Sequence, residues 1–69
     1  MTLVTWTIYD HPKDQPDVFV VRKFVGESPT AEAYAHPDIE VLREMMLDAG
    51  LVCLPRHASD DSVIVETWI

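Results

Sequence analysis

The sequence predicts a small α+β domain in which four strands and one helix follow the order ββαββ. Three observations predict it: strand-like alternation at both ends of the chain, one helical stripe in the middle, and a length of 69 residues. A chain this short builds one thin core layer between a sheet and a helix, so we expect a single domain over residues 1–69. The dense β-branched and aromatic residues at both ends favour two central strands.

Two strands are expected in the first third of the chain. Residues 4–9 alternate between apolar side chains and threonine or tyrosine, which is the period-2 pattern of a strand. Residues 10–17 contain two prolines and three aspartates, a composition typical of a loop. Residues 18–25 form the second strand, and the charged Arg22 and Lys23 in its middle are typical of an exposed edge.

One helix is expected in the middle, over residues 37–49. Residues 27–36 form a connector before it, in which Ser28 and Pro29 could begin a helical turn. Arg43 and several acidic residues are expected to face away from the core, and Gly50 stands where a left-handed C-cap belongs. The expected apolar stripe consists of Ile39, Val41, Leu42, Met45, Met46 and Ala49.

The last two strands are expected at residues 51–54 and 63–69, separated by a polar turn. We expect a mixed sheet in the order 2-1-4-3, with the first and last strands parallel in the centre and the helix across one face, a β-grasp-like arrangement. This topology places the loop that follows the first strand and the turn at residues 56–62 at opposite ends of the sheet, about 20 Å apart.

Composition and charge exclude several function classes. A hydrophobic fraction of 48% and a charged fraction of 25% are those of an ordinary globular domain. The formal net charge of −7 argues against a nucleic-acid partner, because phosphates select clustered Lys and Arg. The single cysteine, Cys53, is typical of a reducing cytosol. No signal peptide or membrane-spanning segment is expected, so we predict a cytoplasmic protein with no membrane partner.

The last strand suggests a candidate interface. Alternation over residues 63–69 puts Ile64, Glu66 and Trp68 on one face, which stays uncovered if the other face meets the helix. Tyr9, Ile64 and Trp68 are then candidate binding residues, because aromatic side chains anchor protein contacts. In the alternative, the face with Ile64, Glu66 and Trp68 meets the helix, and Trp68 is a core residue. The predicted function is a noncatalytic interaction module that binds a protein partner or a second copy of the chain.

A second hypothesis is a small-molecule-binding protein or weak enzyme. It would use Arg56 and His57 in the polar turn, with His36 near the start of the helix. Asp10 and His11 form an alternative loop-end site. No cofactor is expected for either hypothesis.

Catalytic and metal motifs are weak in this chain. Zinc sites rely on close pairs such as C-x-x-C or H-x-x-x-H, and the sequence has neither, so we expect no metal site. Cys53 stands between Val52 and Leu54, which favours an inert core or half-core thiol over a nucleophile. Adjacent Asp60 and Asp61 are good turn residues and usually point apart. An enzyme is therefore the less favoured class.

The segments TWTIYDHP, LPR and IVETWI, at residues 5–12, 54–56 and 64–69, resemble those of a family of short uncharacterised bacterial proteins. The resemblance spans both ends and most of the chain. It implies a bacterial, cytoplasmic origin and carries no activity and no site residues with it.

Overall fold

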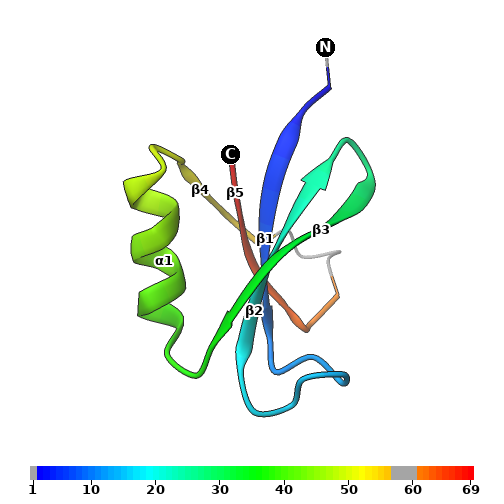
Figure 1. The fold of residues 1–69 in the computed structure, drawn as a ribbon, viewed down its shortest axis with the longest axis vertical. Coiled ribbons are helices and arrows are strands. Elements are labelled where there is room, and N and C mark those ends of the chain that lie inside the picture. Colours follow the sequence, from blue (N-terminus) through cyan, green and yellow to red (C-terminus); the bar gives the residue numbers. More distant parts are fainter. Residues whose placement is uncertain (1, 57–60) are drawn as a thin grey trace.

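The computed structural model describes residues 2–56 and 61–69, and these residues form five strands and one helix (Figure 1). The elements in chain order are β1 (Val4–Asp10), β2 (Phe19–Val25), β3 (Ser28–His36), α1 (Ile39–Asp48), β4 (Cys53–Pro55) and β5 (Ile64–Trp68). Neighbouring strands are all antiparallel, in the order β3-β2-β1-β5-β4. The α+β class is confirmed.

Strand β3 is the main difference from the sequence prediction, which assigns residues 27–36 to a connector. Alanines, a glutamate and a proline give this segment low strand propensity, but pairing along β2 supplies its backbone partners. Gly26, with a φ of 61°, is the first of the two residues in the connecting hairpin turn, where glycine is favoured. The helical turn predicted at Ser28 and Pro29 is wrong, because Pro29 lies near the start of an edge strand.

The added strand reverses the direction of every element after it. The chain enters α1 from the opposite end of the sheet, so β5 runs antiparallel to β1. The four-stranded mixed sheet in the order 2-1-4-3 and the β-grasp-like arrangement are therefore wrong, although the four expected strands keep their neighbours. The predicted separation of the two polar loops is also wrong: Asp10 N donates to Val63 O at 2.7 Å, so both chain segments lie at one end of the sheet.

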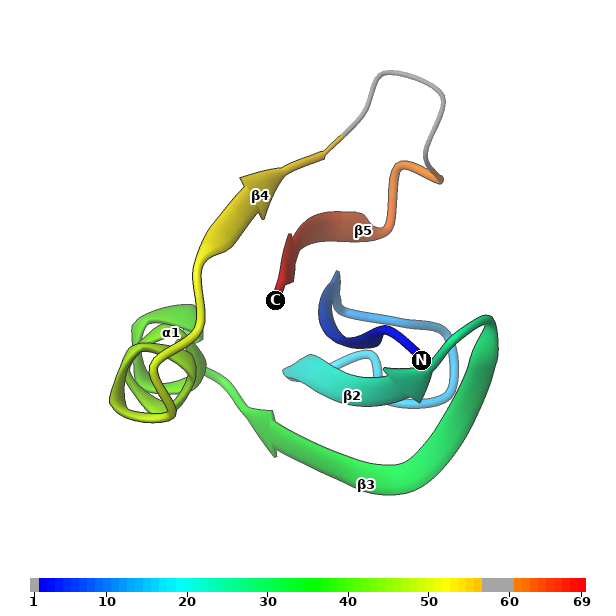
Figure 2. The same ribbon diagram turned by 90° about the horizontal axis from the view of Figure 1, so that it is seen from above.

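The sheet is curved, and both of its edge strands, β3 and β4, reach toward α1 (Figure 2). The ring of Trp6 on β1 stacks with that of Tyr34 on β3, with ring centroids 6.0 Å apart and planes 21° apart. These two strands are not neighbours, because β2 lies between them. Curvature therefore brings side chains of separated strands together on the face that meets the helix, which we call the helix face.

The core lies between α1 and the helix face. Its buried members are Ile8, Val21, Leu42, Met46 and Trp68. Each buried aliphatic side chain of this kind contributes about 1.5–3 kcal/mol to folding. Partly buried residues pack around them: Trp6, Phe19, Ile39, Met45, Leu51 and Val65.

The last strand takes the alternative that the sequence left open, in which Trp68 is a core residue. Trp68 lies opposite Trp6, and Glu66 lies opposite Ile8, so both side chains point to the helix face. Trp68 is only 4% exposed. Thr67 lies opposite Thr7 on the other face. A buried tryptophan ring outweighs the cost of turning Glu66 inward, because the glutamate finds partners there.

The ends of α1 explain why the helix begins and stops where it does. The Asp38 side chain accepts a hydrogen bond from Glu40 N at 3.0 Å, which satisfies one free donor of the first turn. At the other end Gly50 N donates to Leu47 O and Leu51 N donates to Met46 O, the two bonds of a Schellman cap. Gly50 has a φ of 79°, so the predicted left-handed C-cap is confirmed.

We expect Gly50→Ala to destabilise the fold by about 1 kcal/mol, because an alanine Cβ is disfavoured at positive φ. No atom beyond the adjacent residues and the helix's own backbone lies within 4 Å of the added Cβ, so the cost is one of backbone conformation and not of collision. Gly50→Asn is the matched control, since asparagine tolerates this conformation better. Urea unfolding followed by circular dichroism measures the free energy of unfolding of both variants. An equal loss of stability in Gly50→Ala and Gly50→Asn would contradict the explanation.

Candidate functional site

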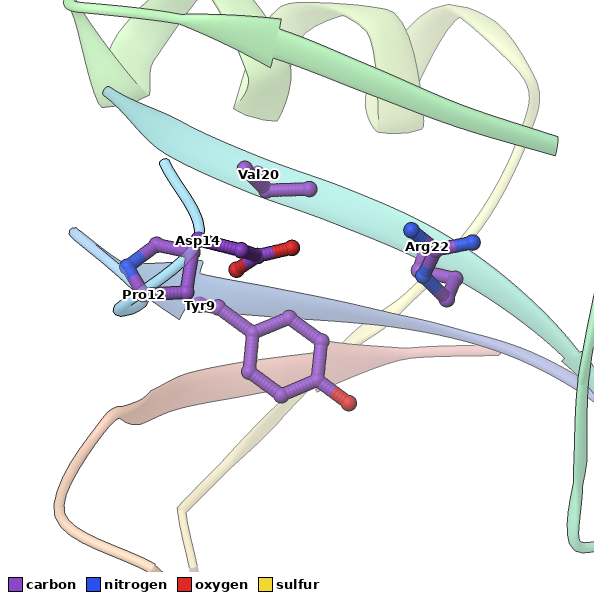
Figure 3. Close-up of a pocket in the computed structure, with 5 residues that line it drawn as sticks. All are labelled: Tyr9, Pro12, Asp14, Val20 and Arg22. Atoms are coloured by element: carbon purple, nitrogen blue, oxygen red, sulfur yellow. The ribbon is translucent and has the colours of Figure 1, made fainter. Parts of the chain in front are cut away.

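A small pocket opens on the face of the sheet that is turned away from α1, which we call the outer face. Its lining residues are Tyr9, Pro12, Asp14, Val20 and Arg22, and its volume is about 150 Å³. Figure 3 shows the Asp14 carboxylate, the Tyr9 ring and the Arg22 guanidinium around the opening. Tyr9 lies opposite Val20 in the β1–β2 ladder, so the two strands form the floor and the loop between them forms one wall.

The loop between β1 and β2 places the acidic wall of the pocket. Gln15 N donates to Pro12 O at 2.9 Å, which closes a four-residue turn with Asp14 at its third position. His11 precedes this turn with a φ of 48°, and its ring packs edge-on against Phe19 with centroids 4.8 Å apart. The loop is therefore anchored by its own backbone and by one aromatic contact.

Arg22 is held on the opposite side of the pocket. Its Nη1 donates to Thr30 O at 2.7 Å, beside a shift in the β2–β3 register. At the same irregularity Thr30 Oγ1 donates to Lys23 O at 2.9 Å. The bulge thus turns a backbone carbonyl toward the guanidinium and fixes the position of its charge.

Tyr9 is the half-buried aromatic residue of the pocket. Burial raises the pKa of its hydroxyl, and the nearby Arg22 charge lowers it by less, so the net pKa lies above its usual value. The phenol is therefore a hydrogen-bond donor at neutral pH and not a base. The pocket offers donors on Tyr9 and Arg22, acceptors on Asp14 and the Tyr9 hydroxyl, and the apolar side chains of Val20 and Pro12.

The structure separates the three predicted binding residues. Tyr9 lines the pocket, and Ile64 is its partner across the β1–β5 ladder, where the register shifts between Ile8 and Tyr9. Trp68 lies in the core and is not on the uncovered face. The bulge explains the split, because it breaks the strict alternation that would keep Ile64 and Trp68 on one face.

The second predicted set is not assembled within the described residues. His36 ends β3 and Arg56 follows β4, and these strands are the two edges of the sheet. His36 Nδ1 accepts from Asp38 N at 2.9 Å, whereas Arg56 Nη1 donates to Ser62 O at 3.5 Å. His57 lies outside the described residues.

The alternative loop-end pair lies beside the pocket. Asp10 and His11 hydrogen bond to each other through Oδ1 and Nδ1, and they stand between two pocket residues, Tyr9 and Pro12, in the sequence. The sequence predicts Arg22 only as a charged residue of an exposed edge strand. The signal that could have found it is hairpin register, because Tyr9, Val20 and Arg22 must share a face once residues 10–17 close a hairpin.

A second charged cluster joins α1 to β5. Arg43 binds the Glu66 carboxylate with two nitrogens, from Nε to Oε2 at 3.1 Å and from Nη2 to Oε1 at 2.9 Å. Trp68 Nε1 also donates to Glu66 Oε2, at 2.8 Å. The remaining Arg43 bond goes to the exposed Glu40. The prediction that Arg43 faces away from the core is wrong, because Glu66 draws it against the sheet.

These contacts set the ionisation of Glu66. Burial raises the pKa of its carboxyl, but hydrogen bonds from Arg43 and Trp68, with the Arg43 charge, hold that pKa below its usual value. Hydrogen bonds to Glu66 and Glu40 raise the pKa of Arg43 in turn. Because every group in the cluster is satisfied by a neighbour, we assign it a structural role.

Cys53 lies at the edge of the same cluster. It is opposite Trp68 in the β4–β5 ladder and is exposed, so the prediction of a core or half-core residue is wrong. Partial burial of the sulfur and the neighbouring Glu66 charge raise its pKa above the usual value. The thiol is therefore accessible but weakly ionised, which disfavours it as a nucleophile.

Comparisons with protein-family models, with curated proteins and with solved structures find no match for this chain. Within residues 2–56 and 61–69, no three His, Cys, Asp or Glu side chains lie close enough together to hold a metal ion. No helix in this part of the chain is long and apolar enough to cross a membrane. The outer-face pocket is therefore the candidate site, on geometric grounds alone.

We expect the Glu66 ion pair to stabilise the fold at neutral pH and to fail in acid. The pKa of Glu66 is depressed in the folded state, so its contribution is present above the ordinary pKa of about 4.5 and disappears as pH falls through the folded pKa. Glu66→Gln should cost about 1.5–3 kcal/mol at neutral pH, and this gap should close in acid. Urea unfolding of the native protein and of Glu66→Gln, from neutral to acid pH, measures this difference in unfolding free energy.

Glu44→Gln is the matched control, because it removes the same charge from an exposed position of α1. The control should follow the native protein at every pH. A gap between native protein and Glu66→Gln that persists unchanged to low pH would contradict the assignment.

We also expect Cys53 to react slowly with iodoacetamide at about pH 8, because little thiolate is present there. Glu66→Gln should speed the reaction several-fold by removing the neighbouring negative charge. Mass spectrometry of the alkylated protein gives the rates, and Glu44→Gln again serves as control. An unchanged rate in the Glu66 variant would show that its charge does not control the thiol.

Proposed function

We propose that this protein is a noncatalytic interaction module that binds a protein partner through the outer face of its sheet. The observation that carries the proposal is the pocket of about 150 Å³ around Tyr9. Small-molecule sites usually measure about 300–1,000 Å³, so this volume suits one protruding side chain better than a whole ligand. Pockets of that kind receive the anchor residues of protein interfaces.

The chemistry of the pocket walls supports the same function. Tyr9 combines a large apolar ring with a hydroxyl donor, which is why tyrosine is enriched in interfaces. Val20 is only 4% exposed and gives the pocket an apolar floor. Arg22 is already oriented by Thr30 O, so little side-chain entropy is lost when it binds a partner.

Further apolar side chains extend the surface beyond the pocket. Leu54 lies opposite Thr67, which shares the outer face with Thr7, so Leu54 belongs to that face as well. Val52 and Ile69 exchange backbone hydrogen bonds at 2.7 and 2.9 Å and are both exposed. Alternation places them on the same face as Leu54. A partner could therefore contact both the pocket and the β4–β5 end of the sheet.

The net charge favours a different protein over a second copy. Each chain carries a formal charge of −7, so two copies repel each other during encounter. A neutral or basic partner avoids this repulsion. The partner is therefore expected to be another chain, in place of the homodimer that the sequence left open.

We expect Tyr9→Thr to weaken partner binding by at least about tenfold, because it removes the anchor ring, while the β-branched threonine still favours a strand. Immobilised native and variant proteins can be compared by quantitative mass spectrometry of the proteins they retain from a lysate of the source organism. Urea unfolding of the variant separates lost binding from lost fold.

Leu47→Ser is the control, because Leu47 is an exposed apolar residue on α1, 60% accessible and remote from the outer face. The same partner should be retained by native protein and by this control. A partner lost with Leu47→Ser but kept with Tyr9→Thr would move the interface to the helix and overturn the proposal.

A further inference from the structure

The pocket holds two opposite charges that do not pair with each other. Asp14 and Arg22 both line it, yet none of the ion pairs within the described residues joins them. Figure 3 shows the carboxylate and the guanidinium on separate sides of the opening, with the Tyr9 ring beside them. The space between the charges is therefore a gap that a third group can bridge.

The charges restrict what that group can be. A cationic side chain would pair with Asp14 but meet the like charge of Arg22, and a carboxylate would bind Arg22 but meet Asp14. A neutral group with a donor at one edge and an acceptor at the other satisfies both walls. The primary amide has this arrangement, with an NH₂ donor and a carbonyl acceptor on one carbon.

We propose that the pocket receives the carboxamide of an asparagine or glutamine side chain from the partner protein, with its NH₂ donating to Asp14 and its carbonyl oxygen accepting from Arg22. This inference rests on the proposed function and specifies its anchor residue. The methylene stem of the side chain packs over Val20 and Pro12, and Tyr9 provides a further donor.

The chemistry of the amide agrees with its role as a neutral anchor. Hydrogen bonds from a neutral amide to charged partners are charge-assisted, and an amide loses less hydration on entering the pocket than an ion does. The formal charge of −7 attracts cations to the protein as a whole, so rejection of a lysine side chain at the pocket depends on the local charge of Arg22. Specificity thus comes from repulsion of both ionic alternatives.

The test compares N-acetyl-N′-methylamides of glutamine, glutamate and lysine as probes of ¹⁵N-labelled native protein. Glutamine and glutamate have nearly the same shape, so their difference reports charge and donor chemistry alone. The glutamine derivative should shift the backbone amides of Tyr9, Asp14, Val20 and Arg22, with an affinity at least about fivefold above either ionic derivative. No shift in these amides, or equal or tighter binding of the glutamate or lysine derivative, would overturn the inference.

Two variants should switch the preference in opposite directions. Asp14→Asn leaves Arg22 as the only charge, so glutamate should become the best probe, and Arg22→Gln should favour lysine. Asp17→Asn removes a charge from the same loop without lining the pocket, and it should keep the native preference. The dispersion of the amide spectrum shows whether Arg22→Gln remains folded. If Arg22→Gln unfolds, Asp14→Asn still tests the change of preference, because Asp14 lies on an exposed turn.

The outcomes distinguish the anchor from the interface. If the partner retained by native protein still depends on Tyr9 but the glutamine derivative shows no preference, the carboxamide inference fails and the interaction module stands. If no retained protein depends on Tyr9, the proposed interface fails whatever the derivatives do.

Discussion

The ion pair between Glu66 and Arg43 is the interaction on which the packing of helix against sheet depends. A buried carboxylate is tolerated only when its oxygens are bonded, and two nitrogens of Arg43 and the indole of Trp68 provide those bonds. The pair fixes which face of β5 meets α1, and it carries the Trp68 ring into the core. In a chain of 69 residues, whose total stability is about 3.5–10 kcal/mol, such a contact is a large fraction of the whole.

The facing of β5 also determines what the outer face presents. With Glu66 and Trp68 turned inward, the charged and aromatic groups left on the outer face come from the hairpin of β1 and β2. That hairpin is local in sequence, so its loop places Asp14 near Arg22 without help from distant elements. The candidate site therefore depends on short-range structure, whereas the core beneath it depends on contacts between distant segments.

The candidate site was only partly predictable from the sequence. Tyr9 was identified from its place in an alternating strand, and the pocket does contain it. Arg22 and Asp14 were assigned to an edge and to a loop, because neither pattern shows which side chains meet across a hairpin. Arg22 was also read as an edge residue because β3, the true edge beside it, has alanines where strands usually carry β-branched residues.

The sequence by itself determined the α+β class, the helix with its Gly50 cap and the four strands with clear patterns, since each depends on local periodicity or a single backbone angle. Only the tertiary structure decided the fifth strand, the direction of β5 and the inward turn of Glu66. The physical reason is that β3 gains its stability from hydrogen bonds to β2, and Glu66 gains its place from Arg43, 23 residues earlier. Neither partner can be identified from the local sequence pattern of the residue it stabilises.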